Sequence, residues 1–212
     1  MNRTHEHLGT PRAAGIAGVV FAILMAAAIV LVRLALPGGA GGDDITVDAG
    51  QRSAVQSALA LLPFAGIAFL WFMGALRTQA GEHEDRFVST VFLGSGFVFV
   101  ATLFASAAAA GTVLDESQQP LPFGRHFAYS LLTTYAMRMA AVFIFTTSAI
   151  GRRLGLFPRP LVVLGYLAGL TLLVVGADLP WSELVFPAWA LIVGLYILSG
   201  RHPAGPGPAA PA

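Results

Sequence analysis

Residues 127–151 read FAYSLLTTYAMRMAAVFIFTTSAIG, an apolar stretch interrupted by a single charge, Arg138. About 20 apolar residues are enough for a helix to cross the hydrocarbon core of a bilayer, so the stretch predicts a membrane-spanning helix. Arg138 falls close to its middle, where a charged side chain costs roughly 2.5–3.5 kcal/mol on insertion scales. The rest of the fold is therefore expected to compensate this charge.

The composition of the whole chain indicates a membrane protein. Of the 212 residues, 56% are hydrophobic and 11% are charged, and the mean hydropathy is +0.75. Soluble domains are about one quarter charged, so the shortage of charge excludes a soluble domain. A net charge of +1 leaves no basic surface for nucleic acid. The absence of cysteine excludes disulfides, thiolate catalysis and cysteine-ligated metal or iron–sulfur sites.

Six apolar stretches predict an all-α fold, a six-helix transmembrane bundle with short loops. A polar segment (1–12) comes before this transmembrane domain (13–200), and a Pro/Gly/Ala-rich tail (201–212), predicted to be disordered, follows it. The first apolar core exceeds the 7–15 residues of a signal peptide, so we expect a retained span, with cleavage near Ala40 as the alternative. The expected spans are 13–36, 53–76, 87–113, 127–151, 161–177 and 181–199.

Two sets of small residues predict close contacts between helices. Ala101, Ala105 and Ala109 recur every four residues in the third span. Gly165 and Gly169 form a GxxxG pattern in the fifth. Such residues let two helix backbones approach closely within a membrane.

The distribution of arginine predicts that both termini are cytoplasmic. In this orientation eight arginines lie on the cytoplasmic side and three outside, as the positive-inside rule requires. One of the outer three, Arg33, is expected to extend its side chain from the helix end to the headgroups. Tyr129 and Trp181 fall near the same outer interface. The cytoplasmic set is Arg3, Arg12, Arg77, Arg86, Arg152, Arg153, Arg159 and Arg201, and the outer set is Arg33, Arg52 and Arg125.

The candidate ligand-binding residues gather around Arg138. Thr134 and Tyr135 precede it by four and three residues and so share its helical face. No carboxylate lies at the same depth, and Asp178 and Glu183, at the outer ends of the fifth and sixth spans, are the nearest candidate counter-charges. Two interpretations stay open. Arg138 either locks the bundle together, or it faces a water-filled outer cavity and binds an anion.

Other chemistry finds no support in the sequence. The acidic loop 42–48 lacks the ligand spacing of a calcium-binding loop. No intramembrane protease motif occurs in the spans. We therefore predict no catalytic residue, no cofactor and no metal ligand, and a protein that is not an enzyme. The histidines lie outside the apolar cores and cannot ligate a haem inside the bundle: His5, His7, His83, His126 and His202.

Four stretches carry a resemblance to known proteins. They are GIAGVVFAIL (15–24), LLPFAGIAFLWFMGALR (61–77), EDRFVSTVFLGSGFVFVATLF (84–104) and RMAAVFIFTTSAIG (138–151). Together they resemble an uncharacterised family of small six-span bacterial integral membrane proteins, over residues 15–199. The resemblance implies the six-span architecture. It implies no activity, ligand or catalytic residue, since no function is assigned to that family.

These observations predict a non-enzymatic accessory or interaction subunit of the bacterial plasma membrane, in contact with lipid and with partner helices or a second copy. The bacterial origin is indicated by basic residues that are all arginine. The alternative is a small permease or anion-binding protein that uses Arg138 for a small anionic solute. Pro63 in the second span and Pro187, expected to interrupt the sixth, are not equivalent in the two halves. This weakens the inverted repeat that many transporters have.

The predicted orientation can be tested with a reporter enzyme that is active only outside the cytoplasm. Fused after residue 212, the reporter is expected to stay inactive, because the C-terminus lies inside. A fusion in the loop between the first two spans serves as the control and is expected to be active. Activity of the C-terminal fusion would contradict the topology.

Overall fold

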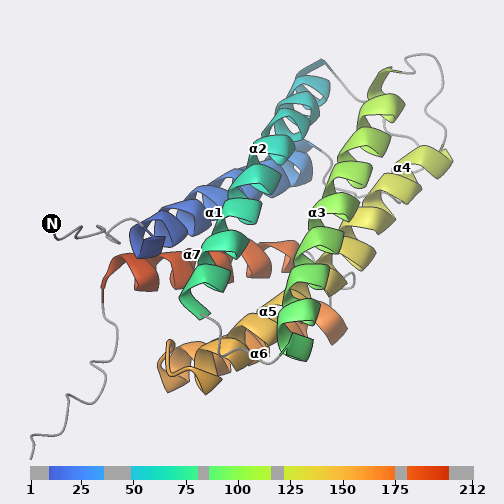
Figure 1. Ribbon diagram of the computed structural model, residues 1–212. Helices are drawn as coiled ribbons and strands as arrows, with labels where there is room; N and C mark the ends of the chain where they lie inside the picture. The colour runs from blue at the N-terminus through green and yellow to red at the C-terminus, as the bar shows by residue number, and fades with distance from the viewer. Residues whose placement is uncertain (1–9, 36–48, 81–85, 116–121, 175–180, 201–212) are drawn as a thin grey trace, which may run out of the picture.

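The computed structural model describes residues 10–35, 49–80, 86–115, 122–174 and 181–200, and the regular structure of these residues is entirely helical (Figure 1). This confirms the all-α fold. The predicted tail (201–212) and the first nine residues lie outside the described ranges. The elements are α1 (Thr10–Ala35), α2 (Ala49–Ala80), α3 (Arg86–Asp115), α4 (Pro122–Ser130), the π-helix η2 (Leu131–Ala136), α5 (Met137–Arg153), α6 (Arg159–Val174), the 3-10 segment η3 (Ser182–Leu184) and α7 (Val185–Leu198).

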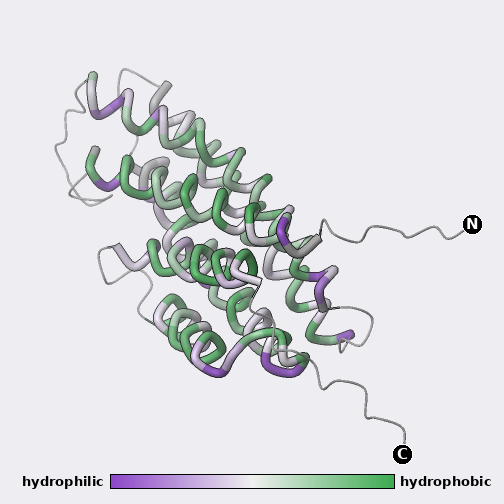
Figure 2. Tube along the Cα trace, turned by 90° about the vertical axis from the view of Figure 1, so that its left-hand side faces the viewer, coloured by the Kyte–Doolittle hydropathy of each residue, from purple (hydrophilic) through white to green (hydrophobic). Residues whose placement is uncertain are grey.

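Four apolar helices are long enough to cross a membrane by length and composition, and two are shorter. The fourth of the long ones is a single continuous helix made of α4, η2 and α5. Apolar residues run along all the described helices, whereas the most hydrophilic segments lie mainly near helix ends (Figure 2). The four long helices are Arg12–Leu34, Ala49–Gln79, Arg86–Thr112 and His126–Arg153, and the shorter ones are Arg159–Val174 and Ser182–Leu198.

Helices α1 and α7 pack against each other in antiparallel orientation with almost no space between their backbones. A Cβ atom at Gly15 would lie 2.8 Å from the carbonyl oxygen of Gly194 and 2.5 Å from Cγ of Leu198. A Cβ atom at Gly194 would lie 2.9 Å from the carbonyl oxygen of Gly15. Larger side chains would force the two helices apart. The start of α1 and the end of α7 therefore lie at the same end of the bundle.

Five phenylalanines, one from each of five helices, form the centre of the core. Phe69 of α2 has its ring centroid 5.1 Å from Phe21 of α1 and 4.9 Å from both Phe99 of α3 and Phe143 of α5. Phe186 of α7 closes the group, 5.0 Å from Phe99. All five side chains are fully buried. The rings are tilted or edge-to-face, the geometry that aromatic quadrupoles favour.

The two sets of small residues have different surroundings. Gly165 and Gly169 of α6 are buried against α5, where their missing side chains leave room for Ser148 and the ring of Phe145. Ala101 and Ala105 of α3 are exposed on the surface of the bundle. The GxxxG pattern thus packs α6 against α5, whereas no described helix covers Ala101 and Ala105.

The two prolines are accommodated in different ways. Pro63 lies inside α2, which continues past it over its full length. Pro187 is the third residue of α7, where an N–H group has no acceptor within the helix and its loss costs little. The expectation that Pro187 interrupts the last helix was therefore wrong, because that helix begins just before the proline.

Replacement of Phe69 by alanine is expected to lower the free energy of unfolding by about 3–5 kcal/mol, since it opens a cavity where four other rings meet. The measurement is thermal unfolding of the purified protein in detergent. Phe64→Ala is the matched control, because Phe64 lies on the same helix and is 62% exposed. Equal losses for the two variants would contradict the proposed core.

Candidate functional site

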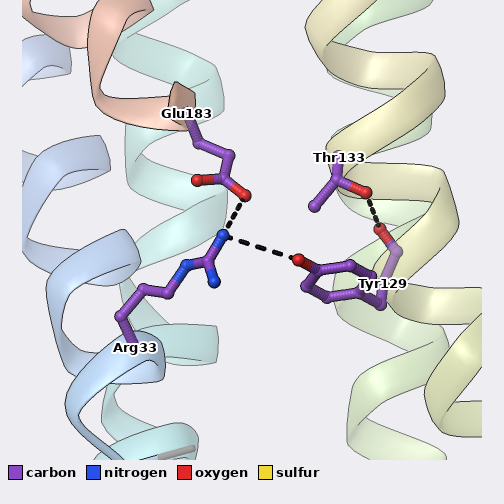
Figure 3. Close-up of polar contacts among 4 residues, drawn as sticks. All are labelled: Arg33, Tyr129, Thr133 and Glu183. Atoms are coloured by element: carbon purple, nitrogen blue, oxygen red, sulfur yellow. Dashed lines mark hydrogen bonds and ion pairs between the residues drawn. The ribbon is translucent and has the colours of Figure 1, made fainter. Parts of the chain in front are cut away.

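An ion pair joins the last turn of α1 to the short segment that precedes α7 (Figure 3). Arg33 Nη2 donates a hydrogen bond to Glu183 Oε1 at 2.5 Å. The two side chains are 16% and 4% exposed, so both charges are largely shielded from the surroundings of the bundle. In such a low-dielectric site, each charge is tolerated because the other is present.

Tyr129, from α4, completes the polar cluster. Its hydroxyl accepts a long hydrogen bond from Arg33 Nη2 at 3.5 Å, and its ring centroid lies 5.9 Å from the guanidinium carbon. Thr133, one turn later, donates from Oγ1 to the carbonyl oxygen of Tyr129 at 2.9 Å. The cluster (Arg33, Tyr129, Thr133 and Glu183) thus connects three segments that are far apart in the sequence (Figure 3).

The backbone before α7 turns Glu183 into the bundle. Trp181 has φ 71° in the left-handed region, which a bulky residue rarely adopts. The 3-10 turn Ser182–Leu184 follows at once and buries Ser182 and Glu183. The second carboxylate oxygen, Glu183 Oε2, is also buried and has no hydrogen-bond partner among the described residues. The surrounding structure must therefore stabilise both the strained Trp181 and the half-satisfied carboxylate.

A π-helical segment divides the long fourth helix. The N–H of Met137 donates to the carbonyl oxygen of Leu132, five residues back, instead of the usual four. Such a turn holds one extra residue and changes the direction of the side chains that follow it. Tyr129 and Thr133 face the cluster, while Tyr135 and Arg138 point to the outer surface. π segments are frequent at functional sites.

Two of the residues predicted beside Arg138, Thr134 and Tyr135, lie with it toward the outside of the bundle. Arg138 is exposed, Tyr135 is 58% exposed and Thr134 is half-buried. In the part of the chain that the structure describes, no carboxylate forms an ion pair with Arg138. Arg138 is thus without a described counter-charge, and both interpretations, the lock and the anion-binding site, stay predictions.

Two expectations about the charges require correction. Glu183 pairs with Arg33 and not with Arg138, and Arg33 is held inside the bundle and does not extend to the headgroups. The physical reason is that a buried carboxylate gains most from the cation that it can contact directly. The predicted topology contained a signal for this pair, because it put Arg33 and Glu183 at the same outer end. Asp178 lies outside the described residues.

A small pocket lies elsewhere, at the end of the bundle where α2 and α5 finish. About 20 Å³ is open to the centres of water molecules, enough for about one water. Arg138, Tyr135 and Thr134 do not line it. In the described ranges, no three His, Asp or Glu side chains are grouped as metal ligands. The lining residues are Leu76, Arg77, Gln79, Phe92, Thr147, Ile150, Gly151, Leu156 and Phe157.

Comparison of the chain with protein-family models, curated proteins and solved structures gives no significant match. Its function must therefore be argued from the arrangement of its own residues.

The ion pair can be tested with a double-mutant cycle on thermal unfolding in detergent. Glu183→Leu is expected to lower the free energy of unfolding by about 3–5 kcal/mol, because it leaves the Arg33 charge buried without a partner. Arg33→Leu combined with Glu183→Leu is expected to recover most of this loss. Arg12→Leu, an exposed arginine on the same helix, is the control. Additive effects of the two single changes would show that the pair contributes no coupling.

Proposed function

We propose that this protein is a non-enzymatic accessory or interaction subunit of the bacterial plasma membrane, with both termini in the cytoplasm. The observation that carries the proposal is the exposure of Arg138 on the outer surface of a helix that is long and apolar enough to span a bilayer. An arginine near the middle of a membrane-spanning helix would make insertion of the helix unfavourable if it contacted lipid alone. A partner helix that covers this surface removes the cost.

The outer surface of the bundle is suited to contact with lipid and with other helices. Large apolar side chains are exposed on every apolar helix. A soluble monomer rarely presents apolar patches of this extent. The most exposed of them include Ile23, Phe64, Trp71, Phe97, Val163 and Val174.

The alternative of an anion permease has less support. It requires a cavity that reaches Arg138, whereas Arg138 and Tyr135 are exposed on the outside of the bundle. Glu183, the one carboxylate within the six described apolar ranges, is bound to Arg33 and so is not available as counter-charge at Arg138. We therefore assign the exposed face of α5 to protein–protein contact.

The proposal predicts a protein neighbour at this face. A photo-reactive benzoylphenylalanine in place of Tyr135 is expected to give a discrete cross-linked adduct with a second polypeptide after irradiation of intact cells. The measurement is gel mobility followed by mass spectrometry of the adduct. Trp71→benzoylphenylalanine, at an aromatic side chain that is 70% exposed on α2, is the matched control and is expected to react with lipid only. Absence of any protein adduct at position 135 would contradict the proposal.

A further inference from the structure

We infer that the partner is a transmembrane helix with one carboxylate near the middle of the bilayer, and that this carboxylate pairs with Arg138. The inference rests on the proposed role as an interaction subunit and names the chemistry of the partner.

The depth of Arg138 leaves the lipid headgroups out of reach. The helix that could span the membrane runs from His126 to Arg153, so Arg138 lies 12 residues after its start and 15 before its end. At 1.5 Å per residue the helix is about 42 Å long, so a hydrocarbon core of about 30 Å centred on it would have its two boundaries roughly 13 and 17 Å from Arg138. An arginine side chain is shorter than either distance. Headgroup phosphates can therefore reach the guanidinium only where the bilayer is strongly thinned.

The described helices supply no free carboxylate at this depth. Across the six apolar helices of the described structure, Glu183 is the one Asp or Glu, and its Oε1 is held by Arg33. A second copy brings the same side chains. A symmetric contact through this face would place Arg138 near the Arg138 of the other copy, and like charges repel. Since the described residues offer no counter-charge, a different membrane protein is its proposed source.

The side chains around Arg138 form a surface of hydrogen-bond donors. The guanidinium has five N–H groups, and the hydroxyls of Tyr135 and Thr134 lie within one turn of it on the same face. A carboxylate offers several acceptor positions and also neutralises the charge, which a neutral amide cannot do. An Asp or Glu on the partner is therefore the group that best complements this surface.

The neighbouring helix α3 leaves room for a close approach beside Thr134, about one turn before Arg138. Helices α3 and α5 run antiparallel, because Phe92 stacks on Phe143 while Ser106 donates a hydrogen bond to the carbonyl oxygen of Ala128. Counted from these two contacts, the exposed Ala101 lies at about the level of Thr134 and Ala105 at about the level of Tyr129, whereas Phe97 lies at about the level of Arg138. The small side chains of the two alanines would not obstruct a helix that packs beside the donor surface.

The test uses model transmembrane peptides in vesicles of phosphatidylcholine and phosphatidylglycerol at pH 8. The probes are Leu/Ala-rich 21-residue peptides with a central Glu, a central Gln or a central Leu. Binding is measured by energy transfer to a dye on Ser130→Cys, which is the single thiol of a chain without cysteine. The central-Glu peptide is expected to bind at least tenfold more tightly than the other two.

Substitutions of Arg138 test whether its guanidinium causes the preference for the central-Glu peptide. Arg138→Leu is expected to abolish the preference for Glu, whereas Arg138→Lys is expected to keep part of it. Arg86→Leu removes an exposed arginine at the start of α3 and is expected to change nothing. Size-exclusion chromatography and thermal unfolding check that each variant is folded. If Arg138→Leu is not folded, Arg138→Gln takes its place with the same expected result.

Three results would overturn the inference. They are equal binding of the Glu and Leu peptides, equal binding of the Glu and Gln peptides, and energy transfer between two labelled copies that depends on Arg138. The proposed function fails separately, when position 135 forms no protein adduct in cells. An adduct in cells combined with no preference for the Glu peptide would leave an interaction subunit whose partner is recognised by other chemistry.

Discussion

The pairing of Arg33 with Glu183 constrains this bundle more directly than any other contact. A buried charge needs an opposite charge beside it, and Glu183 is the one carboxylate within the six apolar ranges that the structure describes. By binding Arg33 it attaches the end of α1 to the turn before α7, and Tyr129 adds the start of the long fourth helix. The pair also leaves Arg138 without a counter-charge within the described chain.

The π-helical segment explains how one helix can present Tyr129 to the inner polar cluster and Arg138 to the surface of the bundle. Before and within it, Tyr129 and Thr133 take part in the inner polar cluster. After it, Arg138 points away from the core, although Met137 and Ala140 beside it are completely buried. A regular α-helix through this region would present the later residues in a different direction. The extra residue in the turn therefore separates an inward-facing structural contact from an outward-facing surface.

Some features could be predicted because they depend on local sequence alone. The six apolar stretches and the shared face of Thr134, Tyr135 and Arg138 follow from run length and helical periodicity. The partners of Arg33 and Glu183 could not be predicted in this way, because 150 positions separate them along the chain. The π segment was also missed, since nothing in LLTTYA distinguishes it from an α-helical turn. Pro187 was misread because its effect depends on where the helix begins.

By itself the sequence determined the class of protein and the chemistry available to it. Its long apolar runs with few charges predict apolar helices, since a helix satisfies every backbone hydrogen bond within one segment. The tertiary structure decided which charges meet. Glu183 pairs with Arg33, and Arg138 points outward, because of how helices far apart in the sequence pack together. No local sequence pattern encodes that packing.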